Sequence, residues 1–468
     1  MPTTQTQCLP AAAAPNGNPS TLHAIRVTSA PALHFVTAAL IALAAGSAHA
    51  SGFQLIENGS GLGNGFAGSA AAAEDASTIF PNPAGMTRLP GLNISAGTTA
   101  ISTIFKFGDN HSTGPGGLPL GSNTGGNAGS LSAVPNAYLS WQASPNWFVG
   151  LGITAPFGLA TQYDDNWIGR YQSTKFSITT INVNPSVAYK VDDRLSIGAG
   201  VSWQHLDADY QRNVPAAGLI PRLPSDLPAT TLAAMAGQLK ASPDMKARVK
   251  LGGDAWGWNV GLLYQLSDAT RIGASYRSTM RYSASGTTTL RNIPGLFAGK
   301  IPGSADNSAT TTLPDTAVLS VVHDLTPKWQ LLGDVSWTGW SSLPSLKINS
   351  GALGEDQLKL EFRNTWRVAL GANYQFTPSW KFRAGVAYDQ SPIPSSALRP
   401  SSLPDNDRII VSIGAQYRFN PRTTIDVGYA HLFFHANINN NTDPTKGTLS
   451  GDWQTSADML GVQVSYRY

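Results

Sequence analysis

Few residues of this chain have the spacing of catalytic or metal-binding groups. Residues 63–68 (GNGFAG) satisfy the G-x-G-x-x-G pattern of dinucleotide-binding loops, but no strand precedes them and no acidic partner follows in a strand–helix–strand unit. His431 and His435 would share one face of a strand about 13 Å apart, which is too far for one metal ion. No P-loop, zinc-protease or nucleophile-elbow pattern appears. The sequence predicts no enzyme, no cofactor and no metal site.

The N-terminal region contains the single cysteine of the chain, and its predicted removal would leave no cysteine for catalysis or metal binding. Arg26 supplies a positive charge, residues 33–45 (LHFVTAALIALAA) an apolar core, and residues 48–50 (AHA) an A-x-A cleavage site. We therefore expect a secretory signal peptide at 1–50 and a mature chain that begins at Ser51. The single cysteine, Cys8, would be cleaved off with it. The stretch before Arg26 is either an extended leader or the product of a start codon assigned too early.

Composition narrows the fold class. The chain has 468 residues, and its 31 basic and 28 acidic residues give no support for nucleic-acid binding. No run of about eighteen uninterrupted apolar residues follows the signal, which argues against transmembrane helices. A soluble chain of this length would usually form about two or three domains, and a single large barrel is the main exception. The content of Gly (47), Trp (12) and Tyr (14) suits such a barrel.

From about residue 91 onward, apolar and polar residues alternate with a period of two. Ile272, Ala274 and Tyr276 share one face of a predicted strand. Arg271 and Arg277 lie on the other face. A soluble sandwich would also alternate, but here the apolar faces end in Trp, Tyr or Phe, as at a lipid boundary. The polar faces carry Arg and Asp, as a hydrated lumen allows.

The connections alternate strictly between short and long. The predicted strands are 92–107, 134–142, 147–156, 176–190, 194–212, 254–267, 270–287, 313–324, 328–340, 364–376, 380–390, 408–419, 423–435 and 457–468. The long connections are 108–133, 157–175, 213–253, 288–312, 341–363, 391–407 and 436–456. Short periplasmic turns and long external loops are typical of outer-membrane barrels, and a soluble sandwich has no reason to sort its loops in this way. The sequence therefore predicts an all-β, transmembrane antiparallel barrel of about 14 strands over 91–468.

Residues 51–90 do not follow the alternation. They are rich in Gly and Ala, end in 82–85 (NPAG), and are too few for a domain with its own core. Because they follow the cleavage site directly, they start on the periplasmic side and can fold into the lumen. About fourteen strands enclose more space than wall side chains can fill. We therefore expect 51–90 to form a hatch, or plug, in the lumen.

The segment 51–85 (SGFQLIENGSGLGNGFAGSAAAAEDASTIFPNPAG) resembles the hatch of FadL-type outer-membrane long-chain fatty acid transporters, the OmpP1/FadL/TodX-like family. The likeness continues at 156–167, 254–278, 313–320 and 389–408, and covers nearly all of 51–468. It implies uptake of hydrophobic substrates, most of all long-chain fatty acids, across the outer membrane of a Gram-negative bacterium. In this family an external groove captures the substrate, a pocket in the barrel binds it, and the hatch shifts. The substrate then leaves sideways at a kink in the third strand.

The resemblance also implies which residues act. Asn82, Pro83 and Ala84 match the hatch motif that gates the pore. Pro156 and Gly158 match the third-strand kink, where Pro lacks a donor and Gly tolerates unusual dihedral angles, so strand pairing would be interrupted. A plain strand end is the alternative for this pair.

Three substrate-binding residues follow from the same resemblance. Arg212 aligns without gaps with an arginine that faces the bound carboxylate, and a cation at the end of an apolar pocket would anchor one carboxylate. Lys359 is the nearest candidate for the family's second basic residue, at a shifted spacing. Phe53, at the start of the hatch, is the third. An unpaired surface arginine is the alternative for Arg212.

The long connection 213–253 suits an external landing site. It contains a predicted short helix at 230–240 with one apolar face. The groove candidates are Leu219, Leu223, Leu227, Leu232, Met235 and Leu239. So much aliphatic surface on an external loop fits a site for greasy ligands. The alternative is that the loop only packs over the barrel mouth.

Three other functions are weighed against fatty acid uptake. Some relatives carry aromatic hydrocarbons, which have no carboxylate for Arg212 to bind. An outer-membrane hydrolase would need a Ser/His/Asp-type catalytic set, and the sequence contains no motif for one. A general porin would be obstructed by the predicted hatch. The expected partners are hydrophobic small molecules, outer-membrane lipid, lipopolysaccharide and the barrel-assembly machinery. We expect a monomer that binds no nucleic acid.

Overall fold

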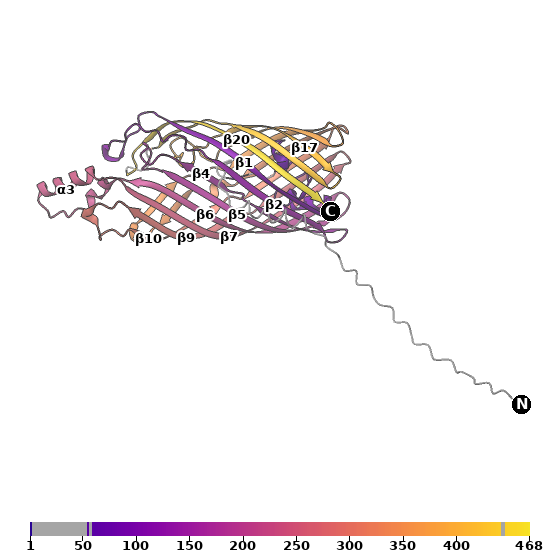
Figure 1. The fold of residues 1–468 in the computed structure, drawn as a ribbon, viewed down its shortest axis with the longest axis horizontal. Helices are drawn as coiled ribbons and strands as arrows, with labels where there is room; N and C mark the ends of the chain where they lie inside the picture. Colours follow the sequence, from indigo (N-terminus) through magenta and orange to yellow (C-terminus); the bar gives the residue numbers. More distant parts are fainter. Residues whose placement is uncertain (2–53, 56–58, 441–444) are drawn as a thin grey trace.

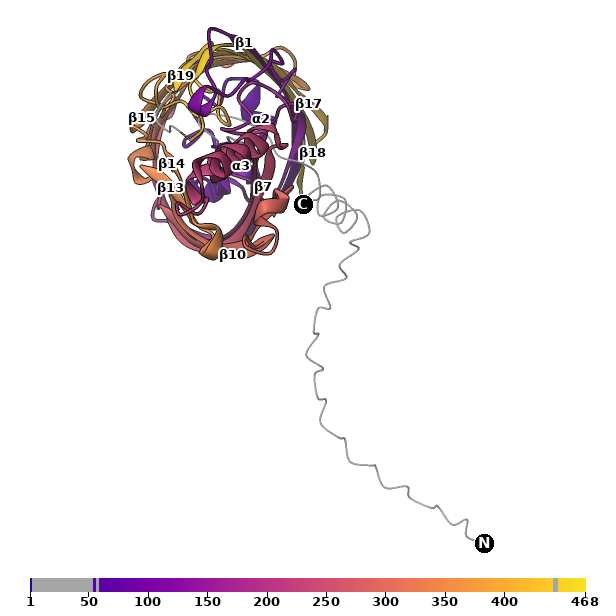
Figure 2. The ribbon, with the colours of Figure 1, turned by 90° about the vertical axis from the view of Figure 1, so that its left-hand side faces the viewer.

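The computed structural model describes residue 1 and residues 54–55, 59–440 and 445–468. The predicted signal peptide at 1–50 and Phe53 lie outside the described residues. The described strands form one antiparallel sheet that closes on itself, because β1 (Leu92–Asp109) pairs with β20 (Leu449–Arg467). Figure 2 shows the closed ring end-on. The predicted 14-strand barrel is confirmed.

Twenty strand segments make up the fourteen barrel strands, because six of those strands are interrupted. The remaining bounds are β2 (Leu131–Gln142), β3 (Trp147–Thr154), β4 (Gly158–Gln162), β5 (Lys175–Lys190), β6 (Leu195–Val214), β7 (Met245–Ser267), β8 (Thr270–Arg277), β9 (Met280–Arg291), β10 (Ser304–Leu313), β11 (Thr316–Asp324), β12 (Trp329–Thr338), β13 (Ser345–Asn349), β14 (Glu355–Lys359), β15 (Thr365–Gln375), β16 (Trp380–Asp389), β17 (Arg408–Asn420), β18 (Thr423–Phe433) and β19 (Ala436–Asn440). The interrupted strands are β3/β4, β8/β9, β10/β11, β12/β13, β14/β15 and β18/β19.

The strands turn their apolar side chains outward. On β15, Leu370 is 62% exposed, whereas its neighbour Ala369 is 1% exposed and faces the lumen. The charged Arg367 also faces the lumen and is 6% exposed. A soluble sandwich would have the reverse arrangement, because water would face its outer surface. The outer surface of this barrel therefore suits lipid.

Aromatic pairs mark the boundary of that lipid-facing surface. They stand beside three of the short turns, where Trp147 contacts Tyr189, Trp329 contacts Tyr374, and Trp380 contacts Tyr417, with ring centroids 4.6 to 4.8 Å apart. Amphipathic rings prefer the level of the lipid headgroups. The short-turn end therefore carries one aromatic girdle.

Several strands extend further into the predicted external loops than the alternation indicates. β7 begins at Met245 rather than at 254, β10 at Ser304 rather than at 313, and β20 at Leu449 rather than at 457. Beyond the membrane the outer face of a strand meets water, while the inner face packs in apolar clusters that include Val249 and Leu251. The lipid-facing apolar pattern therefore stops while the backbone pairing continues. In Figure 1 these extensions run toward the left-hand end of the barrel, which carries the long loops.

Short helices occupy the long loops. α3 (Ala229–Ala241) confirms the helix predicted at 230–240 and lies beyond the external end of the barrel, over its mouth (Figures 1 and 2). The 3₁₀ turns are η3 (Pro115–Gly117), η4 (Ala216–Arg222), η5 (Gly295–Phe297), η6 (Trp340–Ser342) and η7 (Gly351–Leu353). Among the described residues no helix is long and apolar enough to cross a membrane.

The described part of the predicted hatch lies inside the barrel. It contains α2 (Gly59–Leu62), η1 (Ala76–Ile79) and η2 (Pro83–Arg88), which contact the lumen side of strands on several parts of the wall. Glycines of the wall permit this close approach. A Cβ on Gly261 would stand 1.9 Å from Asn82 Oδ1, and one on Gly385 would stand 2.1 Å from the Asn64 carbonyl oxygen. Any side chain at these two positions would displace the hatch.

Candidate functional site

The hydrogen-bonded wall is interrupted at the third strand. β2 pairs with β3 only over 137–142, and residues 131–136 of β2 pair with β1 alone. Beyond the interruption, β4 pairs with β5 and not with β2. Pro156 lies in the interruption and Gly158 begins β4, as the sequence predicts for a kink. The edges of β2 and β4 therefore face the same break in the wall without backbone pairing between them.

Two contacts hold the kink in place. The Thr180 hydroxyl, on the neighbouring β5, accepts a hydrogen bond from the Phe157 N–H at 2.9 Å and donates to the Phe157 carbonyl at 2.8 Å. The start of the hatch supplies the second contact, because the Leu55 N–H donates to the Pro156 carbonyl at 2.7 Å. Gln54 forms a backbone bridge with Phe157. The backbone groups freed at the kink are thus bound by a side chain and by the hatch.

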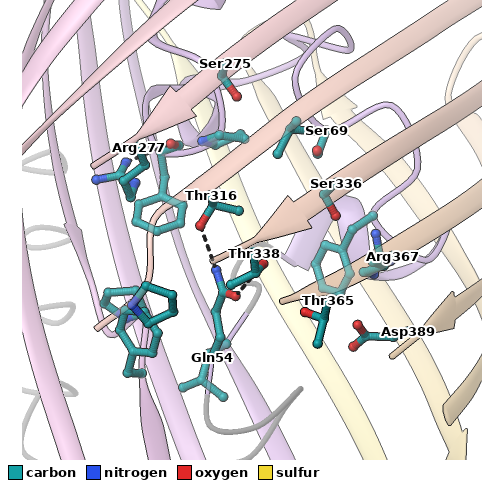
Figure 3. A pocket seen from close by; sticks show the side chains of 18 of the residues that line it. Gln54, Ser69, Ser275, Arg277, Thr316, Ser336, Thr338, Thr365, Arg367 and Asp389 are labelled. Carbon is teal, nitrogen blue, oxygen red and sulfur yellow. Dashed lines mark hydrogen bonds between the residues drawn. The ribbon is translucent and has the colours of Figure 1, made fainter. Parts of the chain in front are cut away.

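A chamber of about 1370 Å³, partly open to the rest of the lumen, lies beside the kink. Figure 3 shows its polar side, where the Gln54 side chain donates to Thr316 and accepts from Thr338, both at 3.3 Å. Apolar residues from the kink, the hatch and the wall complete the lining; they are Leu55, Phe66, Phe80, Phe157, Met280, Val318, Ile410, Leu432 and Met459.

Apolar side chains fill the lumen between this chamber and the external loops. The ring centroids of Phe157 and Trp340 lie 6.3 Å apart in an edge-to-face contact, and those of Trp340 and Phe362 lie 5.8 Å apart. The same buried cluster includes Leu159, Phe176, Ile178, Leu206, Leu313, Leu343 and Leu360. An apolar column therefore joins the kink to the external half of the barrel.

The predicted carboxylate anchor, Arg212, lines an external groove of about 1720 Å³ that is open to solvent. Its Nε donates to Asp356 Oδ2 at 2.9 Å, and Lys446 Nζ donates to the other oxygen of the same carboxylate at 3.0 Å. Burial raises the pKa of Asp356, but the two cations outweigh burial and hold the pKa below its ordinary value. The Asp356 carboxylate, which lines the groove, is thus held ionised between Arg212, also in the lining, and Lys446.

The second predicted basic residue, Lys359, is not the one that lies beside Arg212. Lys359 does not join Arg212: it pairs with Glu361 at 2.7 Å, and its side chain is 57% exposed. The two-residue period of β14 places Lys359 on the face opposite Asp356, which explains the separation. Lys446 stands with Arg212 instead. The sequence reasoning missed Lys446 because it lies in a different external loop.

The leucines of the 213–253 connection divide into two groups. Leu219 lines the groove and packs with Leu223 and Leu239 in one apolar cluster. Leu227, Leu232 and Met235 belong to neither set. The face of α3 predicted to be apolar is nevertheless its less exposed face, and α3 contacts η4. Part of the predicted landing surface therefore packs over the mouth.

Hydrogen bonds and ion pairs fix the hatch to the wall. Asn82 caps η2 by accepting from the Ala84 N–H at 3.1 Å, and its amide donates to the carbonyls of Ala70 and Leu262. Asn82 therefore joins two hatch segments to β7. Pro83 occupies the first position of η2. Its missing backbone N–H costs nothing there, because the first N–H of a helix has no partner within the helix. The predicted motif holds the hatch together and attaches it to the barrel.

A buried charge cluster provides another attachment. Glu74 of the hatch binds Lys381 at 3.2 Å and Arg383 at 2.7 Å, both on β16. Arg383 also binds Asp426 of β18 at 2.9 Å. Arg383 is 4% and Asp426 is 2% exposed at the side chain. Moving the hatch would separate Glu74 from these partners, so this cluster resists displacement.

Comparison with known proteins agrees with this architecture. Residues 41–468 match the family model described as "Outer membrane protein transport protein (OMPP1/FadL/TodX)". The chain is 33% identical over 409 residues to the long-chain fatty acid transport protein of Escherichia coli O6:H1, which covers 84% of this chain and 90% of the relative.

Two solved structures have the same fold. A Pseudomonas aeruginosa FadL homologue superposes with a TM-score of 0.79 at 27% identity, covering 89% of this chain and 100% of the other. The toluene transporter TbuX of Ralstonia pickettii superposes with a TM-score of 0.63 at 18% identity, covering 88% and 98%, which shows a common fold. The chain belongs to the OMPP1/FadL/TodX family of outer-membrane transport proteins.

Proposed function

We propose that this protein carries long-chain fatty acids inward across the outer membrane. The observation that carries this proposal is the break in the wall between β2 and β4, which borders a chamber lined in part by apolar side chains. A channel for hydrophilic solutes needs an open axial pore and no break in its wall. A lateral break lets an apolar tail leave into the lipid without crossing water.

Capture begins at the external groove. Arg212 and Lys446 bind the fatty acid carboxylate there, and Leu219 and its neighbours contact the acyl tail. The ligand carboxylate competes with Asp356 for these cations. Hydrogen bonds between charged groups are stronger than those between neutral groups. Replacement of Asp356 at these two cations therefore favours a carboxylate ligand over a neutral one.

Release takes place at the kink. The ligand passes along the apolar column to the chamber, and the hatch, including its Asn82-Pro83-Ala84 motif, shifts to clear the way. Pro156 and Gly158 keep β4 away from β2, which leaves a route into the membrane. Residues 51–90 act as the plug that prevents leakage of hydrophilic solutes. The protein works as a monomer surrounded by lipid and lipopolysaccharide, and the barrel-assembly machinery inserts it.

Binding of a charged and a neutral ligand by one variant tests this proposal. Arg212→Gln should weaken oleate binding by roughly ten- to a hundred-fold and leave oleyl alcohol binding nearly unchanged, because only oleate loses a charge-assisted bond. Lys359→Gln is the matched control, since it removes a loop cation from the opposite face of β14. Equal small effects of Arg212→Gln on both ligands would reject the carboxylate anchor and favour transport of neutral hydrocarbons.

A further inference from the structure

The outer face of β7 carries a row of cations beyond the level of the membrane. On this strand, Trp256 and Trp258 are exposed on the lipid-facing side. The two-residue period of a strand places Lys246, Arg248 and Lys250 in the same outward row, farther from the membrane. Among the described strands, no other has three cations in its outward row. This part of the external wall is therefore distinguished by its positive charge.

The neighbouring strands extend this row into a patch. β5, β6, β7 and β9 lie side by side in the wall (Figure 1). Lys175 faces outward on β5, and Arg291 faces outward on β9, where it is the direct cross-strand neighbour of Lys246. We call the five outward cations the basic patch; they are Lys175, Lys246, Arg248, Lys250 and Arg291.

Two acidic residues position part of the basic patch. Asp209 on β6 accepts hydrogen bonds from Arg248 Nε and Nη2, both at 2.9 Å, and lies 3.3 Å from Lys175 Nζ. Asp165, in a neighbouring loop, pairs with Lys246. These ion pairs hold three of the cations in place. They leave the patch with more positive than negative charge.

Lys250 and Arg291 have no acidic partner of this kind. Both are exposed, and none of the ion pairs in the described structure includes either of them. Lys250 lies opposite Asp209 in the sheet, but that carboxylate binds Arg248 instead. Arg291 lies opposite Lys246, and like charges in directly opposite positions destabilise a sheet. An anion from outside the chain would offset this repulsion.

The distance of the patch from the membrane indicates which anion it can reach. Lys250 lies six residues beyond Trp256, which is about 20 Å along β7. With a strand tilt of about 40°, it stands roughly 15 Å above the level of the Trp256 ring. The polar layer of a phospholipid leaflet is only about 5 to 8 Å thick. The phosphate of a phospholipid therefore lies below the patch, whereas phosphates carried on an extended saccharide reach it.

The other outward acids of these two regions lie apart from the basic patch. On the external part of β20, Asp452 and Asp458 each pair with a histidine. Closer to the membrane on β6 and β7, Asp207 and Asp254 both contact His205. An anionic lipid would therefore bind along β5, β7 and β9 and avoid the β20 side of the barrel.

We propose that the basic patch binds lipopolysaccharide of the outer leaflet through the phosphate groups of its saccharide core. Guanidinium and ammonium groups donate charge-assisted hydrogen bonds to phosphate oxygens. The acyl chains of the same molecule then lie against the apolar outer wall below Trp256. This inference depends on the outer-membrane location and not on the cargo. Ala247 and Val249, the inward residues of the same segment, line the external groove, so the bound lipid steadies the groove wall from outside.

Titration of the full-length barrel with purified lipopolysaccharide tests the site, with bound molecules counted by native mass spectrometry in detergent. Lys250→Gln/Arg291→Gln removes the two cations that have no ion pair and should weaken binding by roughly 25-fold. Each cation near an anionic lipid surface contributes about five-fold. Lipopolysaccharide stripped of its phosphates should bind the wild type weakly. Phosphatidylglycerol in large excess should not displace the intact lipid, because its phosphate lies too low.

Lys106→Gln/Lys347→Gln is the matched control, because it removes two exposed outward cations from β1 and β13. This variant should bind lipopolysaccharide like the wild type, and heat-modifiable migration on gels should show that both variants fold. Wild-type affinity in Lys250→Gln/Arg291→Gln, or an equal loss in the control, would overturn the proposal. Displacement by phosphatidylglycerol would also overturn it, as would binding of polyglutamate in place of lipopolysaccharide, which would assign the face to an acidic polypeptide.

Discussion

The Leu55 N–H donates to the Pro156 carbonyl at 2.7 Å, so the start of the hatch is hydrogen-bonded to the kink in the barrel wall. The adjacent Gln54 bridges Phe157 and also binds Thr316 on the far side of the chamber. These contacts connect the plug to the lateral break directly. A displacement of the hatch therefore frees backbone groups at the kink, and a movement of the kink pulls on the hatch.

Removing the donor at this contact should loosen the hatch. Leu55→Pro deletes the N–H, while Leu55→Met keeps it and roughly preserves side-chain volume. We expect faster entry of a small hydrophilic dye into cells or vesicles with the proline variant, and little change with the methionine variant. Identical dye entry by wild type and Leu55→Pro would show that this bond does not restrain the hatch.

A side chain at the kink should block lateral release. Gly158→Val puts a β-branched residue at a buried position that begins β4, where it favours continuous strand pairing and fills the break. Labelled oleate uptake should fall several-fold, while heat-modifiable migration on gels should show a folded barrel. Gly333→Val is the control, because a Cβ there meets no atom closer than 3.5 Å and lies on β12, away from the break. Normal uptake by a folded Gly158→Val variant would contradict sideways release.

Neutralising the acid of the buried charge cluster should weaken the plug. Glu74→Gln leaves Arg383 and Lys381 without their hatch partner, and breaking a buried ion pair typically costs about 3–5 kcal/mol. We expect increased dye leakage and faster amide hydrogen exchange in the hatch. Asp193→Asn breaks an exposed pair in a periplasmic turn and should have almost no effect on either measurement. Equal protection of the hatch in Glu74→Gln and wild type would refute the attachment.

The ion pairs of the external groove should make it sensitive to acid. Arg212 and Lys446 lower the pKa of Asp356, so the stabilisation is present above the pKa of the unfolded chain and is lost as the pH falls through the lower folded value. At neutral pH, Asp356→Asn should speed hydrogen exchange of β14 relative to wild type. The difference should shrink below about pH 4, where an aspartate of the unfolded chain becomes protonated. A difference that persists unchanged at lower pH would contradict this assignment.

The sequence was sufficient for the barrel. Alternation of apolar and polar residues depends on the environment of each strand face, so it predicted the segments that cross the lipid. It failed where the outer face no longer meets lipid, which is why β7, β10 and β20 are longer than expected. Pro156 and Gly158, assigned to a kink from their own backbone properties, lie at the interruption between β3 and β4.

The charged part of the site was harder to predict, because it depends on residues far apart in the chain. Asp356 and Lys446 meet Arg212 only after barrel closure brings their loops together. Lys359 was the expected partner of Arg212 from its position along the chain. Its side chain lies on the face of β14 opposite Asp356, because neighbouring residues of a strand point to opposite faces.

Uptake of labelled substrates by cells that lack their own fatty acid transporter tests the central proposal most directly. Cells that express this chain in their outer membrane should accumulate labelled oleate well above the empty-vector control. They should accumulate less labelled toluene or oleyl alcohol relative to the same control, and Arg212→Gln should reduce only the oleate signal. Accumulation of oleate at the level of the empty vector, with raised uptake of the neutral compounds, would contradict fatty acid transport.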